Sequence, residues 1–250
     1  MKKLLWAERK KIRRSSVVWI GVFGAAMAAV IIFLLGQEVY YGPQDMYYGT
    51  RYIDHSGWYM NETQSLGTFF VLPAVIALLG SYILCREEQE DTIKSLRMIP
   101  VNESKLAAAK MILTFGFGIF LYVLLFVLTF LTESFLHYSE LPPGMILGFL
   151  KEYFLDGVGI CFAVSPIIAL VARVKKGYWL ALVFAEIYSF TGLFAGMSDV
   201  LTTFYPITAA FNLSGHYGAS GNKAGSMISL LLCGGFSAFL LIGKNRYERN

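Results

Sequence analysis

Six apolar segments constrain this chain more than any other feature of its sequence. A membrane-spanning helix needs about 20 predominantly apolar residues, and each segment is close to that length. Only 15% of the 250 residues are charged, whereas soluble domains average about 25%. The sequence therefore predicts an all-α membrane protein in which 1–250 form a single transmembrane domain. The predicted spans are 16–36, 66–85, 106–131, 156–172, 177–195 and 226–242.

The basic residues predict how these spans are oriented. When the connecting segments are assigned alternately to the two sides of the membrane, eighteen of the 21 Lys and Arg residues fall on one side. Only Arg51, Lys151 and Lys223 fall on the other. Because Lys and Arg accumulate in cytoplasmic segments, we expect six spans with both termini in the cytoplasm.

The N-terminal segment, 1–15, has an amphipathic character of its own. Leu4, Leu5, Trp6 and Ile12 are interspersed among seven basic residues, a composition typical of helices that lie on an anionic inner leaflet. We expect an interfacial helix here. A positive flank that only fixes orientation is the alternative, and the two are compatible.

Two outer segments follow from this topology, 37–65 and 196–225. The first contains six tyrosines, among them Tyr40, Tyr41, Tyr47 and Tyr48, and it carries four acidic residues against a single Arg51. Such an acidic, aromatic surface can attract a cationic amphiphile. Tyrosines at a membrane interface also form simple caps over helix ends, so both interpretations stay open.

The second outer segment, 196–225, contains apolar stretches that are too short to cross the membrane. Pro206 and several glycines interrupt them. Broken apolar pieces at membrane depth are tolerated where protein or an aqueous cavity covers the backbone. The pattern fits a re-entrant or interfacial segment between the fifth and sixth spans, or a loosely packed outer loop.

The link 86–105, between the second and third spans, predicts a short amphipathic helix. Acidic residues fill its first turns and basic residues the later ones, which complements the helix dipole. Ile93, Leu96 and Ile99 lie on one face, and Pro100 ends the helix. Because the inner lipid surface is itself negative, the acidic start favours a protein partner over the bilayer.

No catalytic or nucleotide-binding motif accompanies the spans. The sequence lacks the Gly-x-x-x-x-Gly-Lys-Ser/Thr run of nucleotide-binding loops, the His and Cys spacings of metal sites, and the Gly-x-Ser-x-Gly nucleophile elbow. We therefore expect no cofactor, metal or catalytic site in this chain, and an intramembrane enzyme is disfavoured.

Glu186 is the one carboxylate near the middle of a predicted span. A charged residue there costs about 2.5–3.5 kcal/mol on insertion scales, so its side chain is expected to face the bundle interior, water or a partner. Substrate contact and a hydrogen bond to a neighbouring helix are the two interpretations. Asp156 starts the fourth predicted span and is expected at its outer interface.

At 86–110 the sequence resembles the membrane subunits of type-2 ABC exporters. In that family the second span runs into a Glu-rich helix containing Gly-Thr, followed by Leu, Pro, a Ser-Arg pair and a Lys that enters the third span. Asp91 replaces the usual Gly, and Asn102-Glu103 stand where Ser-Arg is common. The matching residues, in order and at similar spacing, are Glu87, Glu90, Thr92, Leu96, Pro100 and Lys110.

The resemblance implies a permease subunit of an ATP-driven exporter in the bacterial plasma membrane. ATP and Mg²⁺ are expected in two copies of a separate ATPase chain, and a second permease, identical or different, completes the complex. No nucleic-acid partner is implied. The link is expected to be the coupling helix that docks on the ATPase. The residues assigned to coupling are Glu87, Glu88, Glu90, Asp91, Thr92, Leu96, Arg97 and Pro100.

Among such permeases, the small size and the tyrosine-rich first outer loop look most like the Gram-positive subunits that expel lantibiotics or bacitracin-like peptides. The resemblance thus implies self-immunity or resistance through export of antimicrobial peptides or other amphiphiles. The alternatives are an exporter of a drug, lipid, glycan or ion, and a non-transport immunity or sensor protein. The candidate substrate contacts are Glu186, Tyr40, Tyr41, Tyr47 and Tyr48.

Overall fold

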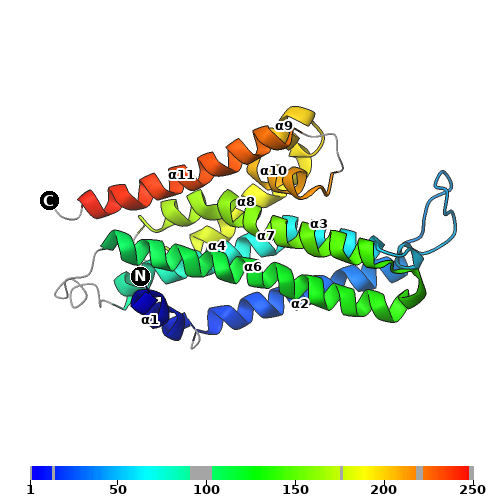
Figure 1. The fold of residues 1–250 in the computed structure, drawn as a ribbon, viewed down its shortest axis with the longest axis horizontal. Coiled ribbons are helices and arrows are strands. Elements are labelled where there is room, and N and C mark those ends of the chain that lie inside the picture. Colours follow the sequence, from blue (N-terminus) through cyan, green and yellow to red (C-terminus); the bar gives the residue numbers. More distant parts are fainter. Residues whose placement is uncertain (1, 13–14, 91–102, 175–176, 218–221, 248–250) are drawn as a thin grey trace.

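The structure is a computed structural model that describes residues 2–12, 15–90, 103–174, 177–217 and 222–247. Within these ranges the regular structure is helical, apart from one β-bridge between Tyr40 and Arg51. The longer helices run along the long axis of an elongated bundle (Figure 1). The all-α prediction is therefore confirmed for the described part of the chain.

Four of the described helices are long and apolar enough to cross a membrane. They correspond to the first, third, fourth and sixth predicted spans. In the last of them the apolar part ends at Ile242. The four helices are α2 (Ser16–Glu38), α6 (Glu103–Leu136), α7 (Pro143–Val171) and α11 (Lys223–Tyr247).

The predicted second span is a bent pair of helices. α3 (Trp58–Phe70) and α4 (Leu72–Gln89) meet at an angle of 45°, and together they are long and apolar enough for one span. Val71 between them has φ −131° and ψ −58°, outside the helical region. Pro73 lies in the first turn of α4, where its missing N–H removes no intrahelical hydrogen bond. The described chain thus has four spanning helices, or five with the bent pair.

The predicted fifth span corresponds to α8 (Leu180–Ala195). This helix is apolar but has only 16 residues, fewer than the about 20 that a perpendicular span requires. A sixth span therefore stays a prediction.

The predicted start of the fourth span is wrong. α7 begins at Pro143, so Asp156 lies near the middle of a continuous helix rather than at its outer interface. α7 is also the central helix, because 61% of its apolar window is buried against 33% for α2 and for α6. Asp156 on this helix is fully buried.

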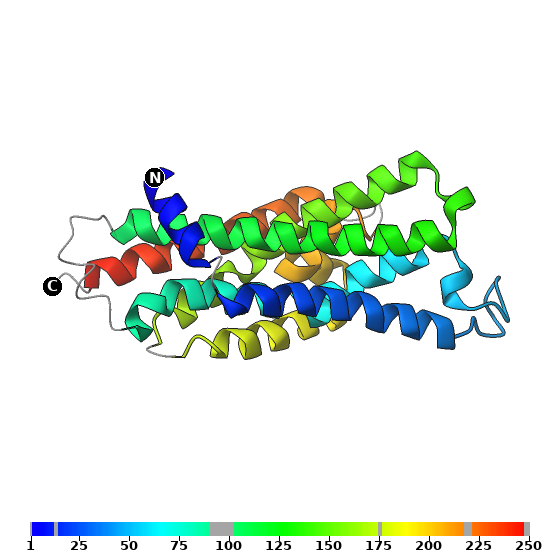
Figure 2. The ribbon, with the colours of Figure 1, turned by 90° about the horizontal axis from the view of Figure 1, so that it is seen from below.

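The two ends of the bundle carry different features. α1 (Lys2–Ile12) leads through Ser15, whose Oγ accepts a hydrogen bond from the Val17 amide at 3.3 Å, into α2. α1 and the final turns of α11 lie at one end, called the α1 end below (Figures 1 and 2). The connection from α2 to α3, with the short helix η1 (Tyr52–Asp54), lies at the opposite end, called the loop end.

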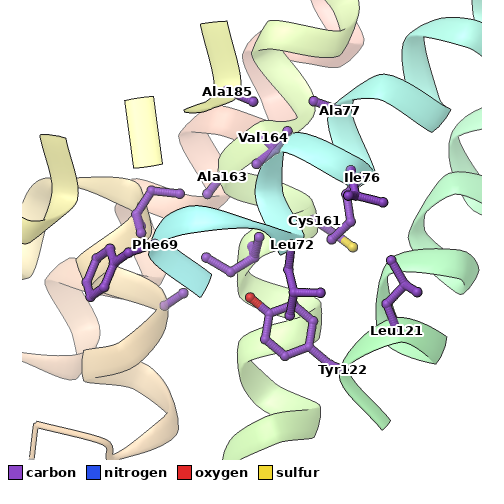
Figure 3. Packing of buried hydrophobic residues seen from close by; sticks show 14 of the residues in the cluster. Phe69, Leu72, Ile76, Ala77, Leu121, Tyr122, Cys161, Ala163, Val164 and Ala185 are labelled. Carbon is purple, nitrogen blue, oxygen red and sulfur yellow. The ribbon is translucent and has the colours of Figure 1, made fainter. Parts of the chain in front are cut away.

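The core forms where α3, α4, α6, α7 and α8 meet. Figure 3 shows Leu72 and Ile76 of the bent pair beside Tyr122 of α6 and Cys161 of α7. Small residues let the backbones approach: a Cβ on Gly157 would lie 3.1 Å from Cβ of Tyr122. In contrast, large apolar side chains on α2, α8 and α11 point outward, as expected for a surface that contacts lipid.

The segment between α8 and α11 forms two short helices, α9 (Asp199–Phe204) and α10 (Pro206–Ser214). α10 is almost entirely buried and packs on α7 and α11. A Cβ on Gly159 of α7 would lie 2.7 Å from Cβ of Ala210, so glycine is required for this approach. Both short helices stop before the loop end reached by α2 and α6 (Figures 1 and 2).

Candidate functional site

Charged side chains from three helices, α1, α4 and α6, contact one another at the α1 end. Lys110 of α6 donates a hydrogen bond to Glu87 Oε2 of α4. Lys11 of α1 donates to Glu87 Oε1 at 3.3 Å and to Glu8 Oε1 at 2.7 Å. We call Glu8, Lys11, Glu87 and Lys110 the α1 cluster. One carboxylate, Glu87, therefore connects α1, α4 and α6.

Burial makes this pairing obligatory. Glu87 and Lys110 are 7% and 3% exposed, and Glu8 is 4% exposed. A charge removed from water at such a site is tolerated only when a partner of opposite sign lies in contact. Lys11 is 38% exposed in its side chain and so links the buried pair to the surface.

Arg86 adds a second connection between α4 and α1. Its Nη1 donates to the Lys11 carbonyl oxygen at 3.3 Å, and its Nε donates to Glu90 Oε1 at 2.8 Å. The Arg86–Glu90 pair is more exposed than the Glu87–Lys110 pair. It places the Glu90 side chain at the surface, where α4 ends.

The α1 cluster lies at the base of the predicted coupling link. Glu87 precedes the last residue of α4, Gln89, by two positions, and Lys110 lies in the second turn of α6. Of the predicted coupling residues, Glu87 is turned into the bundle, Glu90 lies at the surface, and Glu88 belongs to α4. The remaining predicted residues lie outside the described ones: Asp91, Thr92, Leu96, Arg97 and Pro100.

Sequence reasoning missed the partners of Glu87. Lys110 was expected only as a basic residue entering a span, and Lys11 only as part of a basic flank. A signal was present, because Lys110 is followed directly by Met111-Ile112-Leu113 and so stands within an apolar run. A lysine in such a position needs a buried counter-charge.

At the loop end, the tyrosines of the first outer segment divide into two groups. Tyr41 packs its ring against Tyr47 and Tyr52, with ring centroids 5.7 and 4.3 Å apart. Tyr40 and Tyr48 instead are 58% and 67% exposed. The segment is thus an ordered cap held by its own aromatic contacts. Tyr47 is itself 45% exposed, and with Tyr40 and Tyr48 it faces outward.

An ion pair fixes the turn beneath this cap. Arg51 Nη2 donates to Asp54 Oδ1 at 3.0 Å, and the Arg51 amide donates to Asp54 Oδ2 at 3.1 Å. The hydrogen bonds from Arg51 lower the pKa of the Asp54 carboxyl below its ordinary value. Tyr52 next to it stacks on Trp58, with an interplanar angle of 9°.

Glu186 lies far from the tyrosines. It belongs to α8, whereas the tyrosines belong to the loop end (Figures 1 and 2). Its side chain is half-buried, and its neighbours Val183 and Ile187 are 40% and 61% exposed. The structure therefore does not bring the predicted substrate contacts into one site.

Comparison with protein-family models shows which family this chain belongs to. The model described as "ABC-2 family transporter protein" matches residues 4–192, from α1 through most of α8. The chain belongs to the ABC-2 family of transporter proteins. Members of this family are membrane-spanning subunits without an ATPase domain, and the ATPase is a separate chain. This ABC-2 protein is thus a multi-pass membrane protein.

One curated relative gives a narrower comparison. The ABC-2 protein is 30% identical over 128 residues to the bacitracin transport permease protein BCRB of Bacillus licheniformis. The alignment covers 50% of this chain and 61% of that permease. No solved structure matches this chain.

Proposed function

We propose that this chain is the permease subunit of an ATP-driven exporter and that the α1 cluster transmits movement from the ATPase to the spans. The observation that carries the proposal is the buried Glu87–Lys110 pair, which joins the two helices that flank the link. A partner that docks on the link acts on α4 and α6 together. Lys11 extends the same connection to α1.

The complex contains two ATPase copies, each with its own ATP and Mg²⁺, and a second permease chain. Glu90 and the residues that follow it, through Pro100, form the docking surface. The basic residues support a plasma-membrane orientation with both termini in the cytoplasm. α1 and the end of α11 lie at the same end of the bundle, which agrees with this orientation (Figure 1). α8 is then the fifth of six spans.

The segment between α8 and α11 is a re-entrant element in this proposal. α9 and α10 are too short to cross, and α10 is buried by α7 and α11 rather than by lipid. A buried environment is what non-helical backbone at membrane depth requires. The turn at Tyr205 and Pro206, between the two short helices, is partly buried.

The substrates are cationic amphiphilic peptides of the bacitracin or lantibiotic kind, expelled for self-immunity or resistance. The similarity to a bacitracin permease supports this class of substrate. Tyr40 and Tyr48, exposed on an acidic loop, offer faces that attract a cation. Glu186 is a second contact, on the outward side of α8 where a second permease chain can lie beside it.

Purification of the native complex tests the proposal. The chain is captured in nanodiscs, its companions are identified by mass spectrometry, and ATP hydrolysis is measured with and without bacitracin. We expect an ATPase chain to accompany it and bacitracin to stimulate turnover. A chain that purifies without any nucleotide-binding partner overturns the exporter and leaves an immunity or sensor protein.

Variants separate docking from transmission. Glu90→Lys with Leu96→Asp is expected to release the ATPase, because both changes fall on the docking surface. Lys110→Met is expected to keep the ATPase bound but to abolish stimulation by bacitracin. Lys151→Met, at an exposed position of α7, is the matched control and should behave as the unmodified chain. Normal stimulation in Lys110→Met contradicts the role given to the α1 cluster.

A further inference from the structure

Asp156 is a buried carboxyl group that lies away from the α1 cluster. Asp156 of α7 is fully buried, and so is Gln64 of α3. Gln64 Nε2 donates a hydrogen bond to Asp156 Oδ2 at 2.5 Å. This contact joins the outer half of the bent span to the central helix.

Two oxygen atoms of this pair have no hydrogen-bond partner. They are Asp156 Oδ1 and Gln64 Oε1, and both are inaccessible to solvent. An ionised carboxylate and an amide carbonyl can only accept hydrogen bonds. The pair therefore has two buried acceptor atoms and no donor for either of them. Leaving such acceptors without a hydrogen bond costs free energy.

The described residues around Asp156 supply no positively charged partner. Among the described residues, no ion pair involves Asp156. The titratable groups that interact with it electrostatically are Glu152, Tyr122, Tyr153 and Tyr217, from α7, α6 and the residues after α10. All of these are acidic or phenolic, and none compensates a carboxylate charge.

Several hydroxyl groups around the pair are already engaged. Tyr122 Oη and Thr68 Oγ1 share a hydrogen bond of 2.8 Å, and Tyr153 Oη donates to the Met60 carbonyl oxygen at 2.6 Å. Ser214 Oγ donates to the Phe211 carbonyl oxygen at 3.0 Å. The Ser214 hydroxyl also interacts with the Asp156 carboxyl, yet Asp156 Oδ1 and Gln64 Oε1 both stay without a hydrogen-bond partner. A proton held by the pair itself can supply the missing donor.

We propose that Asp156 is a proton-binding site, and that a proton on Oδ1 is donated to Gln64 Oε1 to close a cyclic acid–amide pair between α7 and α3. Each side chain then donates once and accepts once, so both orphaned oxygens are satisfied by a single added proton. The proton is taken from water and returned to water, with no other change. The site is independent of the proposed export function.

The bound proton strengthens the contact between α3 and α7. With the proton bound, α3 is attached to α7 by two parallel hydrogen bonds. Without it, a charged carboxylate and a carbonyl oxygen face an apolar core, which favours separation of α3 from α7 and entry of water. Any movement that opens this contact to water therefore releases the proton.

Isotope-edited infrared spectroscopy tests the protonation state without altering Asp156. The chain carries ¹³C at the aspartate side-chain carboxyls, in lipid nanodiscs at neutral pH, with Asp91→Asn to remove the aspartate outside the described residues. Asp45, Asp54 and Asp199 are exposed, whereas Asp156 is fully buried. We expect an isotope-shifted carbonyl band of a protonated carboxyl. Its absence overturns the proposal.

Variants then assign that band and test the acid–amide pair. Asp156→Asn should remove the band, and Asp199→Asn should leave it unchanged. Because asparagine can also donate and accept once in the same ring, Asp156→Asn should keep the thermal unfolding midpoint near that of the unmodified chain. Asp156→Leu should lower it clearly. A folded Asp156→Asn chain that is as unstable as Asp156→Leu, or that keeps the band, overturns the pairing.

Discussion

At the scale of single residues, the α1 cluster illustrates why buried charges constrain a membrane protein. Glu87 satisfies two lysines at once, and the more buried of them, Lys110, has Glu87 as its ion-pair partner among the described residues. The resemblance to type-2 ABC exporters assigned Glu87 to the docking surface of the coupling helix. Whether the Glu87 side chain points into the bundle depends on the rotation of α4 about its own axis relative to α6. The pattern of apolar residues does not reveal this rotation when nearly every residue of the helix is apolar.

The first prediction at this scale concerns the free energy of unfolding that is lost when the Glu87–Lys110 ion pair is broken. Glu87→Met leaves Lys110 buried without a counter-charge and should destabilise the protein by about 3–5 kcal/mol. The double variant Glu87→Met with Lys110→Met removes both charges and should recover most of that loss. Unfolding in detergent, followed by circular dichroism, measures both. A double variant as unstable as the single one would contradict the account.

The ion pair at the loop end gives a prediction of pH dependence. Asp54 has a lowered pKa in the folded protein because Arg51 donates hydrogen bonds to it. The contact is therefore present above the ordinary aspartate pKa of about 3.9 and is lost only as the pH falls through the lowered value. Trp58, stacked on the neighbouring Tyr52, reports the change by fluorescence. In Arg51→Gln the transition should move to higher pH, and an unchanged transition would rule out the pair as its cause.

At the scale of elements, long apolar runs predicted α2, α6 and α11 closely, because their length and composition leave few alternatives to a span. The same patterning failed at Val71. The run 66–85 is continuously apolar, and the break depends on the backbone of one residue and on packing against α6 and α7. The start of α7 was also missed, because Lys151 and Glu152 interrupt the run although the helix continues through them.

The contact between α7 and α10 provides a prediction for elements. Gly159→Leu places a side chain where Ala210 already lies, at 2.7 Å for the first added atom, and should destabilise the protein by about 1–3 kcal/mol. Gly116→Ala in α6 is the control, because its Cβ would meet nothing within 4 Å. This control should be neutral or stabilising by up to about 1 kcal/mol. Equal unfolding midpoints for the two variants would show that α10 is not packed on α7 as described.

At the scale of the whole molecule, the bundle has an apolar belt of outward side chains between a charged end and a tyrosine-rich end. The sequence predicted this polarity from the distribution of basic residues, which does not depend on packing. It could not predict how far apart Glu186 and the tyrosines lie, because their positions along the membrane normal depend on the bend at Val71 and on the length of α8.

Orientation is the prediction at this scale. In a chain whose three native cysteines are replaced by serine, Tyr48→Cys should react with a membrane-impermeant maleimide in intact cells. Arg9→Cys should react only after the membrane is permeabilised, because the proposed orientation places α1 on the cytoplasmic side. Both positions are exposed in the structure, so burial does not explain a difference. Labelling of Arg9→Cys in intact cells would reverse the proposed orientation.

The buried pair at the base of the link also has a mechanical consequence. If the two helix ends that flank the link were independent, a force applied to the link could move one helix without the other. Part of the movement would then only bend that helix. Here the two ends are tied to each other through Glu87 and Lys110, and to α1 through Lys11. We therefore expect α1, α4 and α6 to move together when a partner acts on the link. Helices that are far apart in the sequence thus meet at one carboxylate, Glu87, and Arg86 adds a further contact between α4 and α1.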